Sequence, residues 1–287
     1  MRILLFISAS LLFLTSCEKV ISIDVPEGQQ QLVVDGFLTN ETGAQKIKLT
    51  VSQPYFDNSS LTGAMGASVK VISSAGDTFL FNENNIGEYI WTPKGNDTLC
   101  KVGLAYSLQI NYKGSIYQAY TTMHPVPVID SLKFSKGEAF GPPSKKDGYS
   151  AEFFARDFPK EDDYYWIKYY HNDTLFSDAS SLLLSVNGAV YPPGADGFEF
   201  IIPVRKAINK RSSQYHLGDS VKVEILSITH DTWQFFSEAK TQMTNGGLFA
   251  TPPANIPTNI SKSTGDGILA IGWFSTSALS RRTETVK

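Results

Sequence analysis

Residues 31–51 read QLVVDGFLTNETGAQKIKLTV, and two stretches within them are typical of β-strands. The first, Gln31–Thr39, contains a β-branched Val-Val pair, and the second, KIKLTV, alternates polar with apolar residues. A period of two places the apolar side chains on one face of a strand and the polar ones on the other. We therefore predict two half-buried strands, and the same pattern recurs along most of the chain.

Five further stretches of this kind follow, separated by turn-prone Ser, Gly, Asn and Asp residues. They are centred on Val69–Val71, Phe79–Phe81, Tyr89–Trp91, Tyr106–Ile110 and Ile116–Thr122. Seven or eight short strands at regular spacing predict an immunoglobulin-like or transthyretin-like β-sandwich, which we assign to residues 28–125.

The segment His124-Pro125-Val126-Pro127 ends this series. Prolines have no backbone N–H to donate to a neighbouring strand, and they bias the preceding residue to extended geometry. We place a boundary there and predict a β-rich C-terminal subdomain at residues 126–287. Its strands are predicted at Ile129–Phe134, Ala151–Ala155, Tyr164–Tyr170, Leu182–Val186, Val221–Ile228 and Ile268–Ser275.

One amphipathic helix is predicted within the C-terminal subdomain. It begins after Asp231, whose carboxylate can cap the first turn with Gln234 three residues on, and it ends near Asn245-Gly246-Gly247. Its apolar face is typical of packing against a sheet. That face comprises Trp233, Phe236, Ala239 or Lys240, and Met243.

The first residues read as a bacterial lipoprotein signal. Arg2 precedes an apolar run, Ile3–Leu14, that is too short to span a bilayer, and small residues precede the Cys in Leu14-Thr15-Ser16-Cys17. We expect a signal peptide at residues 1–16, lipidation of Cys17 and a lipidated linker at residues 17–27. The protein is then held permanently on the outer membrane by its acyl chains.

Composition excludes several classes of protein. Aromatic residues make up 12% of the chain and charged residues 18%, which is typical of a folded domain. The formal net charge is −3 and the chain has no basic stripe, so we expect no nucleic-acid partner.

Acidic Glu18 and Asp24 after Cys17 favour display on the cell exterior, with a periplasmic orientation as the alternative. Lipidation of Cys17 leaves Cys100 as an unpaired thiol, which we interpret as core packing.

Several linked motifs resemble one large family of Bacteroidetes lipoproteins, classified as domain of unknown function 4249. The C-terminal motifs are VKVEILSIT after Gly218-Asp219-Ser220, then the aromatic helix with Gln242, then GGLFATPPANIPTNI at 246–260 and AIGWFS at 270–275. The N-terminal motifs are QLVVDGFLT and VSQPYFD, so the resemblance covers nearly the whole mature chain.

The resemblance implies a two-part β-rich lipoprotein of the outer membrane, similar to members that occur alongside TonB-dependent nutrient receptors. It implies no reaction and no catalytic residues. Our leading hypothesis is a non-enzymatic lipoprotein that binds a nutrient or docks on such a receptor. The alternatives are a hydrolase acting on surface glycans or peptides, and a structural or adhesion lipoprotein of the envelope.

The one candidate contact surface is the loop PPANIPTN, with Pro252, Pro253, Asn255 and Asn259 as its candidate partner or ligand residues. Loops on a rigid scaffold often carry binding. The alternative is a purely structural role, in which the prolines stiffen the loop and the asparagines satisfy local backbone groups.

Catalytic and metal motifs give no support for an enzyme. The sequence has no Gly-x-Ser-x-Gly, His-Glu-x-x-His, phosphate-loop or Cys-x-x-Cys motif. We interpret Glu161-Asp162-Asp163 as a solvated turn, and we expect neither a metal site nor a cofactor. Tyr164–Tyr170 offers aromatic rings that can stack on sugars, although alternation predicts that about half of them are core.

Overall fold

The fold is described by a computed structural model over residues 28–54, 57, 59–137, 148–190, 196–210, 214–246, 250–252, 254–265 and 268–287. These residues form seventeen β-strands, two α-helices and one 3₁₀ helix, so the prediction of a mainly β protein is confirmed. No helix in the described ranges is both long enough and apolar enough to cross a membrane. The predicted signal peptide, Cys17 and linker lie outside the described residues.

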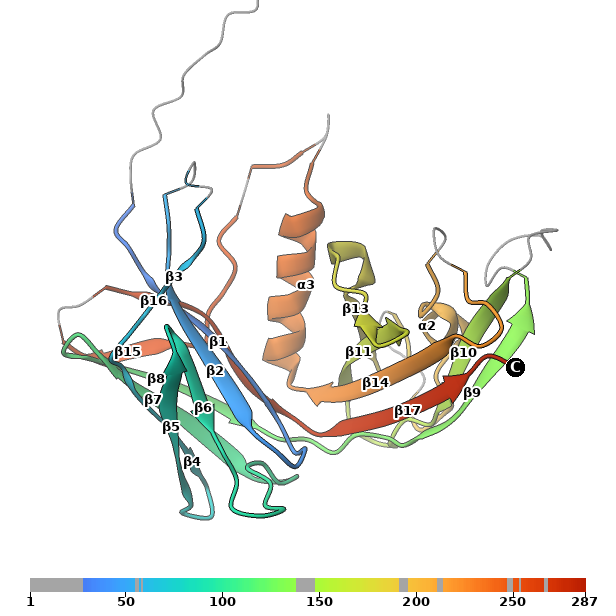
Figure 1. The fold of residues 1–287 in the computed structure, drawn as a ribbon, viewed down its shortest axis with the longest axis horizontal. Helices are drawn as coiled ribbons and strands as arrows, with labels where there is room; N and C mark the ends of the chain where they lie inside the picture. The colour runs from blue at the N-terminus through green and yellow to red at the C-terminus, as the bar shows by residue number, and fades with distance from the viewer. Residues whose placement is uncertain are drawn as a thin grey trace, which may run out of the picture.

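The N-terminal half forms most of a single ten-stranded sheet that curls into a nearly closed barrel (Figure 1). We call it the barrel-like sheet. Its strands are β1 (Leu32–Thr39), β2 (Gln45–Val51), β3 (Thr62–Gly63), β4 (Ser68–Ser73), β5 (Thr78–Asn85), β6 (Glu88–Trp91), β7 (Ala105–Tyr112), β8 (Ser115–Thr122), β15 (Ser261–Thr264) and β16 (Ala270–Ser277). The order is β15-β8-β7-β4-β5-β6-β2-β1-β16, with β3 also paired to β2.

Alternation fills the interior of this sheet with apolar side chains. In β7, for example, Tyr106, Leu108, Ile110 and Tyr112 are buried and belong to the same core cluster. Cys100 is a free, buried thiol in that core, and burial raises its pKa to about 12.

All seven strands predicted before residue 123 are present. They are joined in one curled sheet, whereas a sandwich consists of two packed sheets. The finer assignment to an immunoglobulin-like or transthyretin-like sandwich therefore stays a prediction.

The seam of the barrel-like sheet is closed by side chains. The Asn259 amide donates to the Phe274 carbonyl at 2.7 Å and its Oδ1 accepts from the Phe274 N–H at 3.0 Å, so one side chain replaces a backbone partner of β16. Across the same seam the Tyr117 hydroxyl of β8 donates to the Ile268 carbonyl at 2.8 Å. Gly272 lies beside β1 with φ of +97°, where an added Cβ would lie 2.1 Å from the Val34 carbonyl oxygen.

The second part of the molecule contains two antiparallel sheets that share one core. The two-stranded sheet has β9 (Ile129–Lys136) and β10 (Tyr149–Ala155). The five-stranded sheet has β11 (Tyr164–His171), β12 (Thr174–Leu175), β13 (Leu183–Val186), β14 (Ser220–Ile228) and β17 (Leu279–Thr285). Phe153, Tyr165, Ile167, Val223 and Ile225 lie in this core, together with Val204 from the short helix α2 (Ile202–Lys206).

The chain crosses between the two parts more than once. It leaves β8 at Thr122 and enters β9 at Ile129, which is where we predicted the boundary. It later returns, because β15 and β16 lie in the barrel-like sheet, and only Ala278 separates β16 from β17 of the five-stranded sheet. The division into residues 28–125 and 126–287 as separate domains stays a prediction, and each part is built with strands from beyond residue 125.

The predicted amphipathic helix is α3 (His230–Thr244), and its cap differs from the prediction. Thr229 is the N-cap, with its hydroxyl accepting from the Thr232 N–H at 3.2 Å, whereas Asp231 lies exposed in the first turn. Phe236 is buried as predicted, but Met243 is exposed because the last turns extend beyond the sheets. Lys240 uses its ammonium to bind the Leu182 carbonyl at 2.7 Å.

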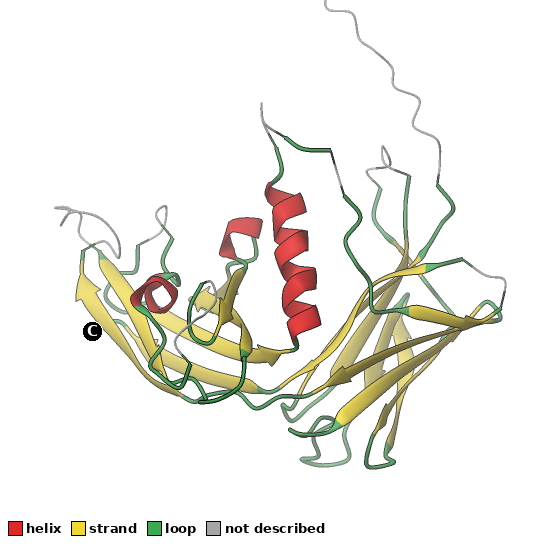
Figure 2. Ribbon diagram, turned by 180° about the vertical axis from the view of Figure 1, so that it is seen from behind, coloured by secondary structure: helices red, strands yellow, loops and turns green. Residues whose placement is uncertain are grey.

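Helix α3 stands in the angle between the barrel-like sheet and the five-stranded sheet (Figure 2). Phe236 stacks on Phe37 of β1, with ring centroids 5.2 Å apart, and contacts Trp166 of β11 at 4.6 Å. Phe235 stacks on Trp273 of β16 at 4.7 Å. One helix therefore packs against both parts of the molecule through aromatic rings, and this contact fixes the angle between them.

We predict that Asn259→Ala lowers the free energy of unfolding by about 2 kcal/mol, because the Phe274 N–H and C=O lose their partner at the seam. Urea denaturation followed by circular dichroism measures this. Asn255→Ala is the matched control, since Asn255 is exposed in the same loop and should change stability by less than about 0.5 kcal/mol. Equal effects of the two substitutions would contradict a structural role for Asn259.

Candidate functional site

One face of the five-stranded sheet lies toward the barrel-like sheet and carries charged residues beside the apolar patch that packs against α3. Along β11, Tyr165, Ile167 and Tyr169 are buried in the core, so Trp166 and Lys168 lie on the opposite face. The strand register places three charged residues in a row across that face. Lys168 is opposite Glu224 of β14, and Glu224 is opposite Arg281 of β17.

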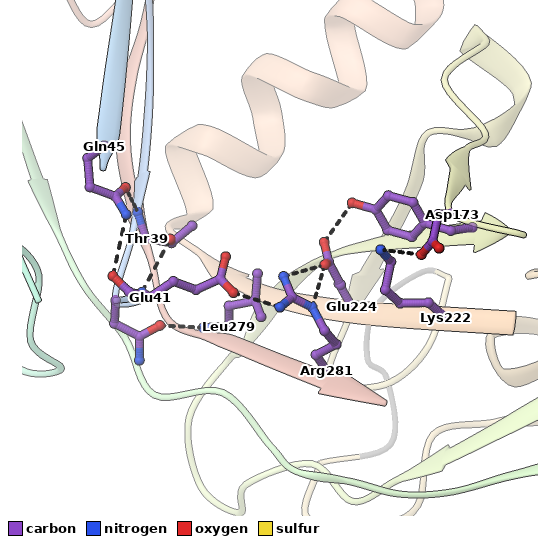
Figure 3. A network of polar contacts seen from close by, with 10 residues as sticks. Thr39, Glu41, Gln45, Asp173, Lys222, Glu224, Leu279 and Arg281 are labelled. Carbon is purple, nitrogen blue, oxygen red and sulfur yellow. Dashed lines mark hydrogen bonds and ion pairs between the residues drawn. The ribbon is translucent and has the colours of Figure 1, made fainter. Parts of the chain in front are cut away.

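Glu224 is the centre of this row and is only 4% exposed. Arg281 binds its Oε1 at 2.7 Å, and the Tyr170 hydroxyl donates to its Oε2 at 2.8 Å (Figure 3). Arg281 also binds Glu41 of the barrel-like sheet's β1–β2 connection at 2.8 Å, beside a bond from the Leu279 N–H to Asn40. Both oxygens of the buried carboxylate are therefore occupied, and the network links the two parts of the molecule.

Lys168 is the least engaged charge on this face. Its ammonium lies 3.9 Å from the centroid of the Trp166 ring, and no described residue offers it a hydrogen-bond or ion-pair partner. Burial lowers the pKa of Lys168, while the carboxylates of Glu224, Glu41 and Asp35 act in the opposite direction. A partly desolvated ammonium of this kind can donate hydrogen bonds to a ligand carboxylate or hydroxyl.

A cavity of about 520 Å³ lies on the outer face of the barrel-like sheet and shares Asp35 and Glu41 with this network. Its lining residues are Asp35, Phe37, Thr39, Glu41, Ala44, Gln45, Lys46, Lys48 and Glu88. Charges of both signs line it, and Lys46 pairs with Glu88 at 3.1 Å. Lys168, Glu224 and Arg281 are not among the described residues that line this cavity, and the charged row is joined to it through Glu41. We call the cavity and the neighbouring charged row together the junction site, whose groups suit a polar ligand that carries hydroxyls or charged groups.

A second cavity, of about 470 Å³, lies at the N-terminus of α3. Its walls combine hydroxyls of Ser107, Thr122 and Thr229 with the rings of Tyr120 and Trp273, and they also include Asp231 and Asn259. Hydroxyls both donate and accept hydrogen bonds and a carboxylate accepts them, so this cavity suits a polar group that can donate hydrogen bonds.

The predicted contact loop follows α3. Pro252 and Asn255 are exposed, Pro253 lies outside the described residues, and Asn259 is committed to the barrel seam. The loop is held to the end of α3, where the Gln242 side chain accepts from the Ala254 N–H at 3.1 Å. Asn259 also lines the cavity at the N-terminus of α3, whereas Pro252 and Asn255 line neither cavity. The role of this loop in partner binding stays a prediction.

The acidic stretch Glu161-Asp162-Asp163 differs from a fully solvated turn at its last residue. Asp163 is 9% exposed and its Oδ2 has no hydrogen-bond partner among the residues that the structure describes. Asp157, which is also buried, accepts the Tyr165 hydroxyl at 2.6 Å. Burial and the neighbouring acids Asp157 and Glu161 raise the pKa of Asp163 to about 7. Across the described parts of the chain, no group of three or more His, Cys, Asp or Glu side chains is arranged to hold a metal ion.

The structure brings together histidines that are far apart in the sequence. His171 binds Asp219 at 2.7 Å, and His216 lies 3.8 Å from the same carboxylate oxygen. Burial alone raises the pKa of Asp219, but hydrogen bonds from Asn172, His216 and His171 lower it to about 2. This cluster fastens the β11–β12 turn to the start of β14.

The sequence patterns did not single out Lys168, Glu224 or Arg281. The available signal was a charged residue within an otherwise apolar strand, namely Lys168 in YYWIKYY and Glu224, with Lys222, in VKVEILSI, whereas Arg281 lies in the polar stretch LSRRTET. Such a residue is unfavourable in a core and normally needs a partner. Only the strand register shows that the partners are one another.

We predict that Glu224→Gln lowers the free energy of unfolding by about 2 kcal/mol, because Arg281 and the Tyr170 hydroxyl lose a buried charged acceptor. Glu284→Gln is the control, since its ion pair with Arg282 on the same sheet is solvent-exposed and worth less than about 0.5 kcal/mol. Urea midpoints measure both. Equal losses would show that burial of Glu224 does not matter.

We predict that the stability of the Asp163→Asn variant relative to the wild type is greater at pH 8 than at pH 5. A carboxyl whose folded pKa is raised favours folding at low pH, and this contribution is lost as the pH rises through about 7. The wild type should lose on the order of 2 kcal/mol over this range relative to the variant. Urea unfolding at both pH values tests it, with exposed Asp130→Asn as the control. A variant that is equally destabilised at both pH values would contradict the prediction.

Comparison with known proteins agrees with the resemblance seen in the motifs. A family model described as Domain of unknown function (DUF4249) matches residues 18–283, which is nearly the whole chain. No curated protein matches the chain. The motif residues have structural roles that fit this match, since AIGWFS contains Gly272 and Trp273 and the loop motif contains Asn259. The chain belongs to the family described as Domain of unknown function (DUF4249).

Proposed function

We propose that this protein is a lipid-anchored outer-membrane protein facing the cell exterior, and that it acts as a non-enzymatic binding or accessory component of a TonB-dependent nutrient uptake system. The lipoprotein signal that ends at Cys17 supports the anchor. The resemblance to a lipoprotein family that occurs alongside TonB-dependent receptors supports the context.

The junction site is the observation that carries the binding role. Its polar groups come from both parts of the molecule and are held by the Glu224, Arg281 and Glu41 contacts, so little reorganisation is needed when a ligand arrives. Lys168 adds an ammonium beside the Trp166 ring, for which no other described residue provides a hydrogen bond or ion pair. The neighbouring cavity of about 520 Å³ is lined by charges of both signs and by the Phe37 ring, which is typical of a site for a small polar ligand.

The same contacts favour binding over hydrolysis. A glycosidase needs two carboxylates facing one cleft, one of which is free to transfer a proton. At the junction site the Glu224 oxygens are both engaged by Arg281 and Tyr170, and Glu41 is paired with the same arginine. Glu224 and Glu41 therefore serve to hold Arg281 in place, and Glu88 of the cavity wall is paired with Lys46.

The test is affinity purification of the tagged protein from its native outer membrane in mild detergent, followed by mass spectrometry. We expect one TonB-dependent receptor in near-stoichiometric amount, together with a diacyl modification on Cys17. Cys17→Ala is the control for the anchor and should be released into the soluble fraction. Purification of the lipidated protein without any enriched barrel protein would count against the receptor role and favour the structural or enzymatic alternatives.

Ligand binding at the junction site is tested separately with Lys168→Met, which keeps the length and apolar stem of the side chain. Thermal shift screening against sugars, amino acids and short peptides should find ligands whose stabilising effect is lost in Lys168→Met and kept in Lys222→Met. Lys222 is the matched control because it lies on the same face but is already paired with Asp173 at 3.3 Å. Ligands that stabilise both variants equally would place the binding site elsewhere.

A further inference from the structure

The strand register gathers several chain ends at one end of the barrel-like sheet. Leu32, the first residue of β1, pairs both with Ala270, the first residue of β16, and with Val51, the last residue of β2. Val51 in turn pairs with Thr62, the first residue of β3. The chain arrives from the N-terminus at this end, which we call the entry end (Figure 1).

Exposed apolar side chains surround the entry end. Leu61 and Leu269 come directly before Thr62 and Ala270, and Ile86 is so close to β3 that a Cβ on Gly63 would contact it. Leu61, Ile86 and Leu269 are between 59% and 66% exposed. Single exposed apolar residues are ordinary, but three around one end of a barrel mark a contact surface.

A cation also lies at the entry end. Lys113 is exposed in the turn between β7 and β8, and Gly265, which leads from β15 toward β16, packs against Gly114 and Ser115 of that turn. Lysine beside exposed leucine and isoleucine is typical of surfaces that meet the boundary between lipid headgroups and acyl chains.

The tether argues that lipid is what covers this surface. From Cys17 to Gly28 there are eleven residue steps, which span at most about 40 Å when extended and about 18 Å as a flexible coil. An acyl anchor on Cys17 therefore keeps the entry end within this distance of the bilayer and raises the effective concentration of membrane at its surface. The opposite end, where Val102 is 47% exposed, lies a further strand length of about 26 Å away.

We propose that the entry end rests on the outer-membrane surface, with Leu61, Ile86 and Leu269 at the boundary of headgroups and acyl chains and Lys113 at the phosphates. This inference rests on the proposed anchor at Cys17. It adds an orientation, in which the barrel-like sheet stands on the bilayer by the end where its chain begins.

The test attaches the mature chain to vesicles by chemistry, so that it does not depend on native lipidation. The Cys17 thiol is coupled to a maleimide lipid in vesicles of phosphatidylethanolamine and phosphatidylglycerol, with or without brominated acyl chains. Cys100 does not compete, because it is 1% exposed. The reporters are Leu61→Trp and Leu269→Trp, with Val102→Trp as the matched control at the opposite end.

We expect brominated lipid to quench the added tryptophan fluorescence of Leu61→Trp and Leu269→Trp at least twofold and to leave that of Val102→Trp unchanged. Removing the lysine with Lys113→Gln should reduce the quenching in vesicles that contain phosphatidylglycerol. Quenching that is absent at residues 61 and 269, or as strong at residue 102, would overturn the orientation. The proposed anchor is tested separately by measuring the mass of the native protein. A mass without acyl chains on Cys17 would refute the anchor.

Discussion

The parallel pairing of β1 with β16 is the constraint on which the rest of the structure depends. Eight residues of β1, Leu32–Thr39, pair in register with Ala270–Ser277, so the first strand and the last strand but one lie side by side. This pairing nearly closes the barrel-like sheet, and it leaves β16 only one residue from β17. Because contacts separated by more than 230 residues must form together, we expect the two parts of the molecule to fold cooperatively and slowly.

The aromatic and charged contacts between the two parts follow from that pairing. Once β16 lies beside β1, the outward faces of both strands lie in the angle occupied by α3, where Trp273 and Phe37 receive its aromatic rings. The continuation into β17 then places Arg281 opposite Glu224 and within reach of Glu41. Apolar packing on one side and a charged network on the other thus hold the same angle, and the junction site is a product of both.

The sequence predicted the elements better than it predicted their partners. Strands with clear alternation, such as β2 and β7, were found because their burial follows the period of two. The strands β15 and β17 were missed because SKST and LSRRTET are polar and half-exposed, so they carry no apolar period. The cap of α3 was assigned to Asp231 instead of Thr229, since both are good capping residues and only the backbone angles decide between them. Lys168, Glu224 and Arg281 were missed because a register across three strands cannot be read from local patterns.

The direct passage from β16 to β17 also has a mechanical consequence. A pull on the N-terminal tether acts on the start of β1, whereas the remainder of the molecule holds β16 at its far end, through Ala278 and β17. Opposed forces at opposite ends of a parallel pair load the strands in shear, so the hydrogen bonds between them must yield together and cannot open one at a time. If the N-terminus is anchored as proposed, a pull on the distal part of the molecule would therefore be resisted at the first strand.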